Sequence, residues 1–111
     1  MQRGNVYRNG ELIGTIWRDE NGNYGFRYTS EYLKRDDALA ISVNLPLREK
    51  PYRSEKLFPF FFNLLAEGAV KEIQCRELKI DPDDEFTRLL KTAGSNTIGA
   101  VTVEEVPDAL L

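Results

Sequence analysis

The residues of this chain that come closest to a chemical motif are carboxylates and amides. Asp19-Glu20-Asn21-Gly22-Asn23 has the spacing with which a calcium loop begins, in which alternate side-chain oxygens converge on one cation. Such a loop also needs glycine at its sixth position and glutamate at its twelfth, where this chain has Tyr24 and Ser30. The acidic segment Asp81 to Glu85 is typical of the start of a helix, where carboxylates face the positive end of the dipole. We therefore expect no metal site and no cofactor.

Nucleophilic catalysis has little support in the residue types. The chain has no histidine, which excludes Ser-His and Cys-His pairs. Cys75 is the single cysteine and lies in a helical pattern, where a buried, unreactive thiol is the usual state. No Walker-type phosphate loop or kinase catalytic signature occurs. The segment Gly94 to Gly99 runs from a helix into a strand, the reverse of a phosphate loop. The sequence predicts a protein that is not an enzyme.

The most unusual chemistry of the chain is aromatic. Four of its six phenylalanines stand within the five residues Phe58 to Phe62. One face of a short helix cannot turn all four rings toward a core, and an exposed ring without a partner reduces solubility. The loop before this run contains Arg48 and Arg53. Arginine beside aromatic residues is common at protein interfaces. The segment therefore predicts a contact surface for another protein.

Composition limits the classes of partner and the compartment. With 111 residues the chain has the size of one domain, which we place at 1–111. Its net charge of −3 and pI near 5.0 argue against direct nucleic-acid binding. The longest apolar stretch, Phe58 to Ala66, falls short of the roughly 20 residues of a membrane helix. No signal peptide is evident, and one cysteine fits a reducing compartment. We expect a cytoplasmic domain without a membrane partner.

The first third of the chain predicts an antiparallel sheet. Asn9-Gly10 lies between Val6–Arg8 and Leu12–Trp17 and is a strong hairpin signal, because both turn positions favour positive φ. A second turn at Glu20–Asn23 leads to Tyr24–Tyr28, where apolar and other residues alternate as in a half-buried strand. These segments predict a three-stranded meander with one apolar face.

Two further strands are expected on either side of the helical part. Ala40–Leu45 alternates again and stops at Pro46, which predicts a fourth strand. Glu31–Arg35 reads as a helical turn or loop before it, and Arg48–Lys56 as a polar loop after it. Ile98–Val106 predicts a last strand, closed by Pro107.

Three helices are expected between these strands. Ser54 or Leu57 precedes a short one, in which Pro59 is tolerable only in the first turn. After Gly68 comes a second helix over Ala69–Lys79, with an apolar stripe at Val70, Ile73 and Leu78.

The third helix has the clearest start and stop signals. Asp81 is placed at its N-cap and Pro82 at its first position, and Gly94 is expected to end it in the left-handed conformation. Phe86, Leu89 and Leu90 form its predicted buried face. The whole pattern indicates an α+β fold.

One set of residues runs through nearly the whole chain: Tyr7 and Gly10, Leu12-Ile13-Gly14, Phe26 and Tyr28, Ile41-Ser42, Leu45-Pro46-Leu47, Phe61-Phe62-Asn63-Leu64-Leu65, Glu67-Gly68, Phe86, Leu89-Leu90, Gly94, and Gly99-Ala100-Val101. This pattern resembles the N-terminal subdomain of the HipA-type serine/threonine kinase toxins. The block from Leu45 to Gly68 is its most specific part. Two positions depart from it, because family members usually have proline where Ala66 stands and often an acidic residue where Asn96 stands.

The resemblance implies a function in a bacterial toxin–antitoxin system. The ATP loop and catalytic residues of such a kinase are absent from this sequence. A free-standing copy of the subdomain resembles HipS, the small subunit of tripartite HipB–HipS–HipT systems. It would bind and inhibit a HipT-like serine/threonine kinase as a non-catalytic antitoxin, while a HipB-like helix-turn-helix protein binds DNA. The expected contact surface comprises Phe61, Phe62, Glu67, Gly68 and Ala69, with Arg48 and Arg53 at its rim.

Other interpretations stay open at this point. The chain could be the regulatory N-terminal fragment of a full-length HipA-type kinase, or a scaffold subunit that does not inhibit. A small β-rich nucleic-acid binder could stack bases on exposed aromatic rings, although the net acidity opposes this. An enzyme is the least supported of these alternatives.

Overall fold

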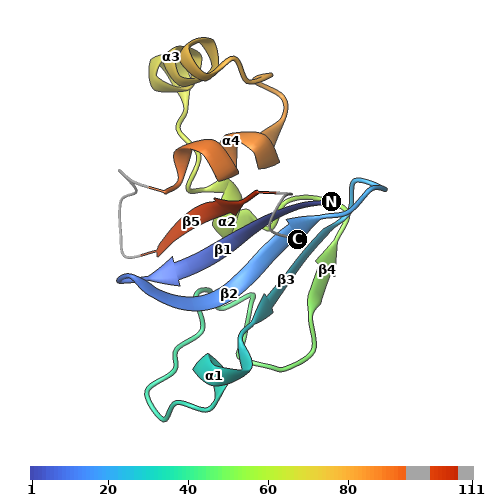
Figure 1. The fold of residues 1–111 in the computed structure, drawn as a ribbon, viewed down its shortest axis with the longest axis vertical. Helices are drawn as coiled ribbons and strands as arrows, with labels where there is room; N and C mark the ends of the chain where they lie inside the picture. Colours follow the sequence, from blue (N-terminus) through green and yellow to red (C-terminus); the bar gives the residue numbers. More distant parts are fainter. Residues whose placement is uncertain (95–100, 108–111) are drawn as a thin grey trace.

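The computed structural model describes residues 1–94 and 101–107, which form an α+β fold on one antiparallel sheet (Figure 1). The strands are β1 (Gln2–Arg8), β2 (Glu11–Arg18), β3 (Tyr24–Tyr28), β4 (Tyr52–Ser54) and β5 (Val101–Val106). The helices are α1 (Ser30–Leu33), α2 (Pro59–Phe62), α3 (Gly68–Leu78) and α4 (Glu85–Thr92). The strand order is β4-β3-β2-β1-β5, so the C-terminal strand returns to the sheet as predicted, and the structure places it beside β1. The part of the predicted last strand before Val101 lies outside the described residues.

Both predicted turns of the meander are confirmed. Asn9 and Gly10 have φ angles of +51° and +82°, which suits a two-residue hairpin between right-handed twisted strands. In the second turn Gly22 has a φ of +81°. The Asp19 carboxylate accepts hydrogen bonds from the backbone N–H groups of Asn21 and Asn23, at 2.9 and 3.0 Å. Asp19 therefore stabilises a turn, and its spacing from the two asparagines needs no cation.

The core lies on one face of the sheet. Its largest fully buried side chains come from the four strands β1, β2, β3 and β5 and from the helices α2 and α4: Val6, Ile13, Ile16, Phe26, Tyr28, Val103, Phe61, Phe86 and Leu89. Figure 1 shows α2 and α4 on one side of the sheet, with α3 standing farther out beyond α4. This leaves α3 in contact with α4 rather than with the sheet.

The prediction of a strand over Ala40–Leu45 is wrong. The segment is a series of bends and turns, and Leu45 donates its backbone N–H to the carbonyl of Ser42 at 3.0 Å. Ile41 and Leu45 are buried, but Val43 is 93% exposed. The alternation of apolar residues therefore reflects a loop that turns two side chains inward.

Tyrosine hydroxyls take the place of a strand partner for this loop. Tyr28 accepts a hydrogen bond from the Ile41 N–H at 3.1 Å and donates one to the Leu45 carbonyl. Tyr32 accepts from the Leu39 N–H at 3.0 Å and donates to its carbonyl at 2.8 Å. Buried backbone groups need partners, and here side chains supply them. The edge strand β4 forms instead within the segment predicted as a polar loop, where Tyr52 pairs with Phe26.

Two of the predicted helix boundaries need correction. The N-cap of α4 is Asp84, whose carboxylate accepts a hydrogen bond from the Thr87 N–H, and not Asp81. Asp81 forms a preceding turn by accepting from the Asp83 N–H at 2.9 Å. Pro82 belongs to that turn, so it does not start the helix. At the other end the C-cap is Ala93 with a φ of −92°, and Gly94 has no positive φ.

None of the helices in the described ranges has the length and apolar content needed to cross a bilayer.

Candidate partner-binding surface

The phenylalanine run divides between the core and the surface. Pro59 occupies the first position of α2, where its missing N–H removes no helix bond. Phe61 is fully buried, with its ring centroid 5.4 Å from that of Phe26, and Phe58 is also buried. Phe60 is partly buried and packs edge-on against Phe61. Phe62 remains 40% exposed. The run therefore leaves the Phe62 ring at the surface, whereas Phe61, also predicted as a contact residue, lies in the core.

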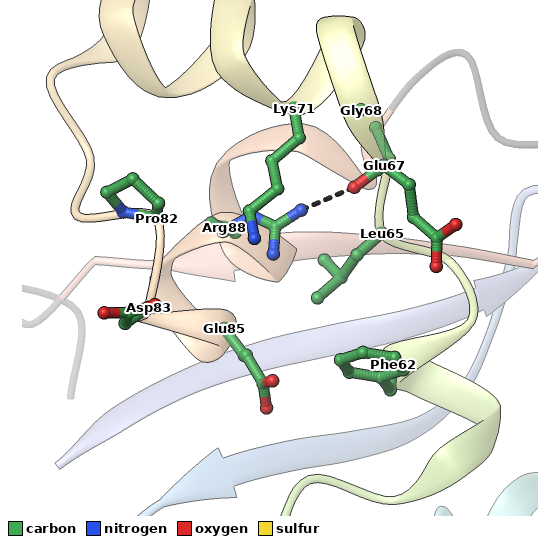
Figure 2. A pocket seen from close by; sticks show the side chains of 10 residues that line it. Phe62, Leu65, Glu67, Gly68, Lys71, Pro82, Asp83, Glu85 and Arg88 are labelled. Carbon is green, nitrogen blue, oxygen red and sulfur yellow. Dashed lines mark hydrogen bonds between the residues drawn. The ribbon is translucent and has the colours of Figure 1, made fainter.

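Phe62 lines a hollow of about 350 Å³ between the end of α2 and the start of α4. We call it the α2–α4 hollow, and its other lining residues are Leu65, Ala66, Glu67, Gly68, Lys71, Pro82, Asp83, Glu85 and Arg88. Figure 2 shows Phe62 and Leu65 on one side and Pro82 and Asp83 on the other, with Arg88 and Lys71 between them. Three carboxylates and two cations thus surround an apolar patch, a composition suited to a polypeptide segment.

Arg88 shapes this hollow, although it was not among the site residues predicted from the sequence. Its side chain is 4% exposed, and its Nη2 donates a hydrogen bond to the Ala66 carbonyl at 2.6 Å (Figure 2). This bond links α4 to the loop before α3, and Gly68, the first residue of α3, has a φ of +62°. Helical periodicity gave no signal for its burial, because Arg88 lies two positions from both Phe86 and Leu90, on the opposite side of the helix from the predicted buried face. Arg88 is a positioning residue for the predicted contact loop.

The helix that leaves the hollow exposes its apolar residues. Val70 and Ile73, one turn apart on α3, are 55% and 54% exposed, and Leu78 is exposed as well. The predicted stripe therefore does not face the core, and the buried residue of α3 is Cys75. The physical reason is that α3 stands outside the sheet layer and packs only by its other side. We call these three residues the α3 surface. Phe62 on α2 and the α3 surface are thus exposed apolar side chains on the two helices that the loop after Phe62 connects.

The remaining predicted site residues lie in different places. Glu67, Gly68 and Ala69 are exposed at the start of α3, beside Phe62. Arg48 stacks on the Tyr52 ring, with its guanidinium carbon 3.6 Å from the ring centroid. Arg53 lies on β4 and lines a hollow with Trp17 on the sheet face away from the core. Neither arginine lines the α2–α4 hollow.

The α4 end of the hollow is fixed by charge. Arg18 of β2 and Asp84 form an ion pair with an N–O distance of 3.0 Å. Partial burial opposes ionisation of Asp84, but hydrogen bonds from Thr87 and Arg18 outweigh it and lower the pKa of this carboxyl. Asp84 is therefore a stable anion that caps α4 and ties it to the sheet. Among the described residues no group of three or more His, Cys, Asp or Glu side chains could hold a metal ion.

Comparisons with known proteins place nearly the whole chain in one family. The family model described as HipA N-terminal domain matches residues 4–104. A solved structure, the N-terminal domain of HipA toxin, superposes with a TM-score of 0.73 at 30% identity, covering 97% of this chain and 95% of that one.

Two curated relatives show the domain in chains of different length. An uncharacterized protein of Haemophilus influenzae is 33% identical over 105 residues, covering 95% of this chain and 93% of that protein. A putative kinase of Sinorhizobium fredii is 31% identical over 97 residues, which are 87% of this chain but only 23% of the kinase. The sequence match, the shared fold and these relatives together show that the chain belongs to the HipA N-terminal domain family.

Proposed function

We propose that this protein is a non-catalytic antitoxin subunit that binds and inhibits a HipT-like serine/threonine kinase. The observation that carries the proposal is the exposure of Phe62 at the α2–α4 hollow, while Phe58 and Phe61 are packed in the core. The α3 surface adds three further exposed apolar side chains. Exposed apolar groups gathered on one side of a small domain are characteristic of a protein interface. Phe62 is the proposed anchor, and Glu67, Gly68 and Ala69 at the start of α3 form the neighbouring contact segment.

The relatives support a kinase as the partner. In the putative kinase of Sinorhizobium fredii the same domain makes up 23% of the chain, so further sequence is joined to it there. The Haemophilus influenzae relative matches over 93% of its length, which is the size expected of a free-standing copy. A separate subunit would then occupy the place that the fused domain has in the longer protein. A HipB-like DNA-binding protein would complete the assembly.

The fused arrangement also supports a second candidate function. The match to one part of a putative kinase is equally consistent with a regulatory N-terminal region of a HipA-type kinase. In that case the same Phe62 surface would pack within one protein. A scaffold role without inhibition would use the surface in the same way but leave kinase activity unchanged.

The test combines binding with kinase activity. The chain would be mixed with the HipT-like kinase of the same genome, and complex formation and autophosphorylation would be measured. Phe62→Asp places a charge in the apolar contact, and we expect it to weaken binding by about 100-fold, the effect of losing a hot-spot ring. Val43→Asp is the matched control, because Val43 is 93% exposed and lies in a different loop.

The outcomes separate the candidates. A stable complex with suppressed autophosphorylation supports the antitoxin, and a complex with unchanged activity supports the scaffold. A folded Phe62→Asp variant that binds and inhibits like the wild type would refute the proposed contact.

A further inference from the structure

The sheet face away from the core is not covered by the helices that pack on the other side (Figure 1). Strand alternation directs Val6, Ile16 and Phe26 into the core, so their neighbours in sequence point outward. Antiparallel sheets commonly have one solvated face, and scattered polar residues there need no explanation. The residues on this face are not scattered.

Four residues lie opposite one another across four strands. Arg3 of β1 is opposite Trp17 of β2, Trp17 is opposite Gly25 of β3, and Gly25 is opposite Arg53 of β4. We call them the outer row. The Trp17 ring lies over Gly25, because a Cβ built there would be 2.2 Å from the indole carbons. The indole thus fills the space between the two arginines, and glycine at position 25 permits this.

Three arginines surround this indole. Arg27 lies two residues from Gly25 on β3 and lines the same hollow of about 490 Å³ as Arg3, Trp17 and Arg53. Among the described residues, no ion pair engages any of these arginines, whereas Arg18 and Arg35 are both paired. The carboxylate of Asp19 also lines the hollow but accepts two backbone hydrogen bonds of its own turn. On a chain of net charge −3, this is a local excess of positive charge.

We propose that the outer row binds a short acidic segment of a partner protein in an extended conformation. Carboxylates of such a segment would pair with the three arginines, and its apolar atoms would lie on the indole. With strands about 4.8 Å apart, the row is about 14 Å long, the length of roughly four extended residues. This surface is separate from the Phe62 surface, and the inference does not rest on the proposed kinase partner.

A peptide fits these observations better than a nucleic acid does. Sheets that bind single-stranded nucleic acid stack two or three bases on several aromatic side chains, and this hollow has one such ring. A continuous phosphate backbone would also meet the repulsion of an acidic chain. The separate carboxylates of a short acidic peptide need only the three arginines of this hollow as ion-pair partners.

Trp17 is the one tryptophan of the sequence, so intrinsic fluorescence reports on the outer row directly. The probe is the blocked octapeptide (Glu-Asp)4, titrated into the full chain at low salt. We expect saturable quenching or a spectral shift, weakened about tenfold by the double variant Arg27→Glu/Arg53→Glu, because two ion pairs are lost. The matched control Lys34→Glu/Lys50→Glu makes the same change of charge at exposed lysines outside the hollow, and should bind within about twofold of the wild type.

Three outcomes would overturn the proposal. No response to the peptide at millimolar concentration, or equal weakening by both double variants, would show that the arginines are a solvated face. Tighter binding of an eight-nucleotide oligothymidine than of the peptide would assign the surface to nucleic acid instead. Circular dichroism of each variant establishes that it is folded before titration.

Discussion

The Tyr28 hydroxyl is expected to hold the Ile41–Leu45 loop in place, and the variant Tyr28→Phe tests this with the removal of one oxygen. The ring would keep its packing, with centroids 4.9 Å from Phe26 and 6.1 Å from Tyr32. The change removes the acceptor of the Ile41 N–H and the donor to the Leu45 carbonyl. Ile41 and Leu45 are both buried, so water does not readily replace the hydroxyl as the hydrogen-bond partner of their backbone groups.

The expected cost follows from these two backbone groups. A buried group left without a partner costs about 1–3 kcal/mol, and partial relaxation of the loop toward water lowers the sum. We therefore expect a loss of about 2–3 kcal/mol in the free energy of unfolding. With an m-value of about 1–2 kcal/mol/M in urea, the unfolding midpoint should fall by about 1–3 M. The loss of about 2–3 kcal/mol is a large part of the free energy of unfolding of a typical domain, which is about 5–15 kcal/mol.

Urea unfolding followed by circular dichroism measures this loss. Tyr52→Phe is the matched control, because its hydroxyl donates to the Pro46 carbonyl at 2.5 Å in a solvent-exposed place. Water can replace that bond, and the control should cost about 0.5 kcal/mol. Hydrogen exchange at the Ile41 amide should accelerate in Tyr28→Phe alone. Equal midpoints for the two variants, or an unchanged Ile41 amide, would refute the assignment of the loop to the Tyr28 hydroxyl.

Two further predictions concern α4. Asp84→Ala removes the N-cap and the ion pair with Arg18, and should cost about 1–2 kcal/mol at pH 7 by thermal or urea unfolding. Because the folded-state pKa of Asp84 is lowered, its contribution to the free energy of unfolding is complete above the unfolded pKa of about 3.9 and is lost as pH falls below it. The difference in stability between Asp84→Ala and the wild type should therefore shrink in acid. A difference that stays constant with pH would show that the negative charge of Asp84 does not contribute. Arg88→Met keeps the apolar stem but removes the bond to the Ala66 carbonyl, and should accelerate hydrogen exchange at Glu67 and Gly68 while the protein stays folded. Unchanged exchange there would show that other contacts hold the loop.

Local rules predicted most of the sheet from the sequence. The Asn9-Gly10 turn and the alternation in Tyr24–Tyr28 depend on φ preferences and strand periodicity, which act over a few residues. Pro59 at the first position of α2 follows in the same way from its missing N–H. The division of the Phe58–Phe62 run between core and surface was also predictable in kind, because four adjacent rings exceed one face.

The errors arise where a distant side chain decides the local structure. Ala40–Leu45 has the pattern of a strand, but its backbone groups bond to Tyr28, which lies far away in sequence. Asp81 and Pro82 look like a better helix start than Asp84, yet Asp84 is held by Arg18 of β2. The position of α3 outside the sheet layer, and hence the exposure of Val70 and Ile73, depends on the whole packing and leaves no local signature.

The two proposed surfaces lie on opposite sides of the sheet. Phe62 and α3 belong to the helical side, whereas Arg3, Trp17 and Arg53 lie on the strand face away from the core. The core between them contains fully buried side chains such as Ile16 and Phe26, so a partner on one side does not physically obstruct the other. If both proposals hold, the effects of Phe62→Asp and Arg27→Glu/Arg53→Glu on their respective partners should be independent, as expected for distant sites. A domain of this size could then join two proteins without any movement of its own, because each surface is preformed in the fold.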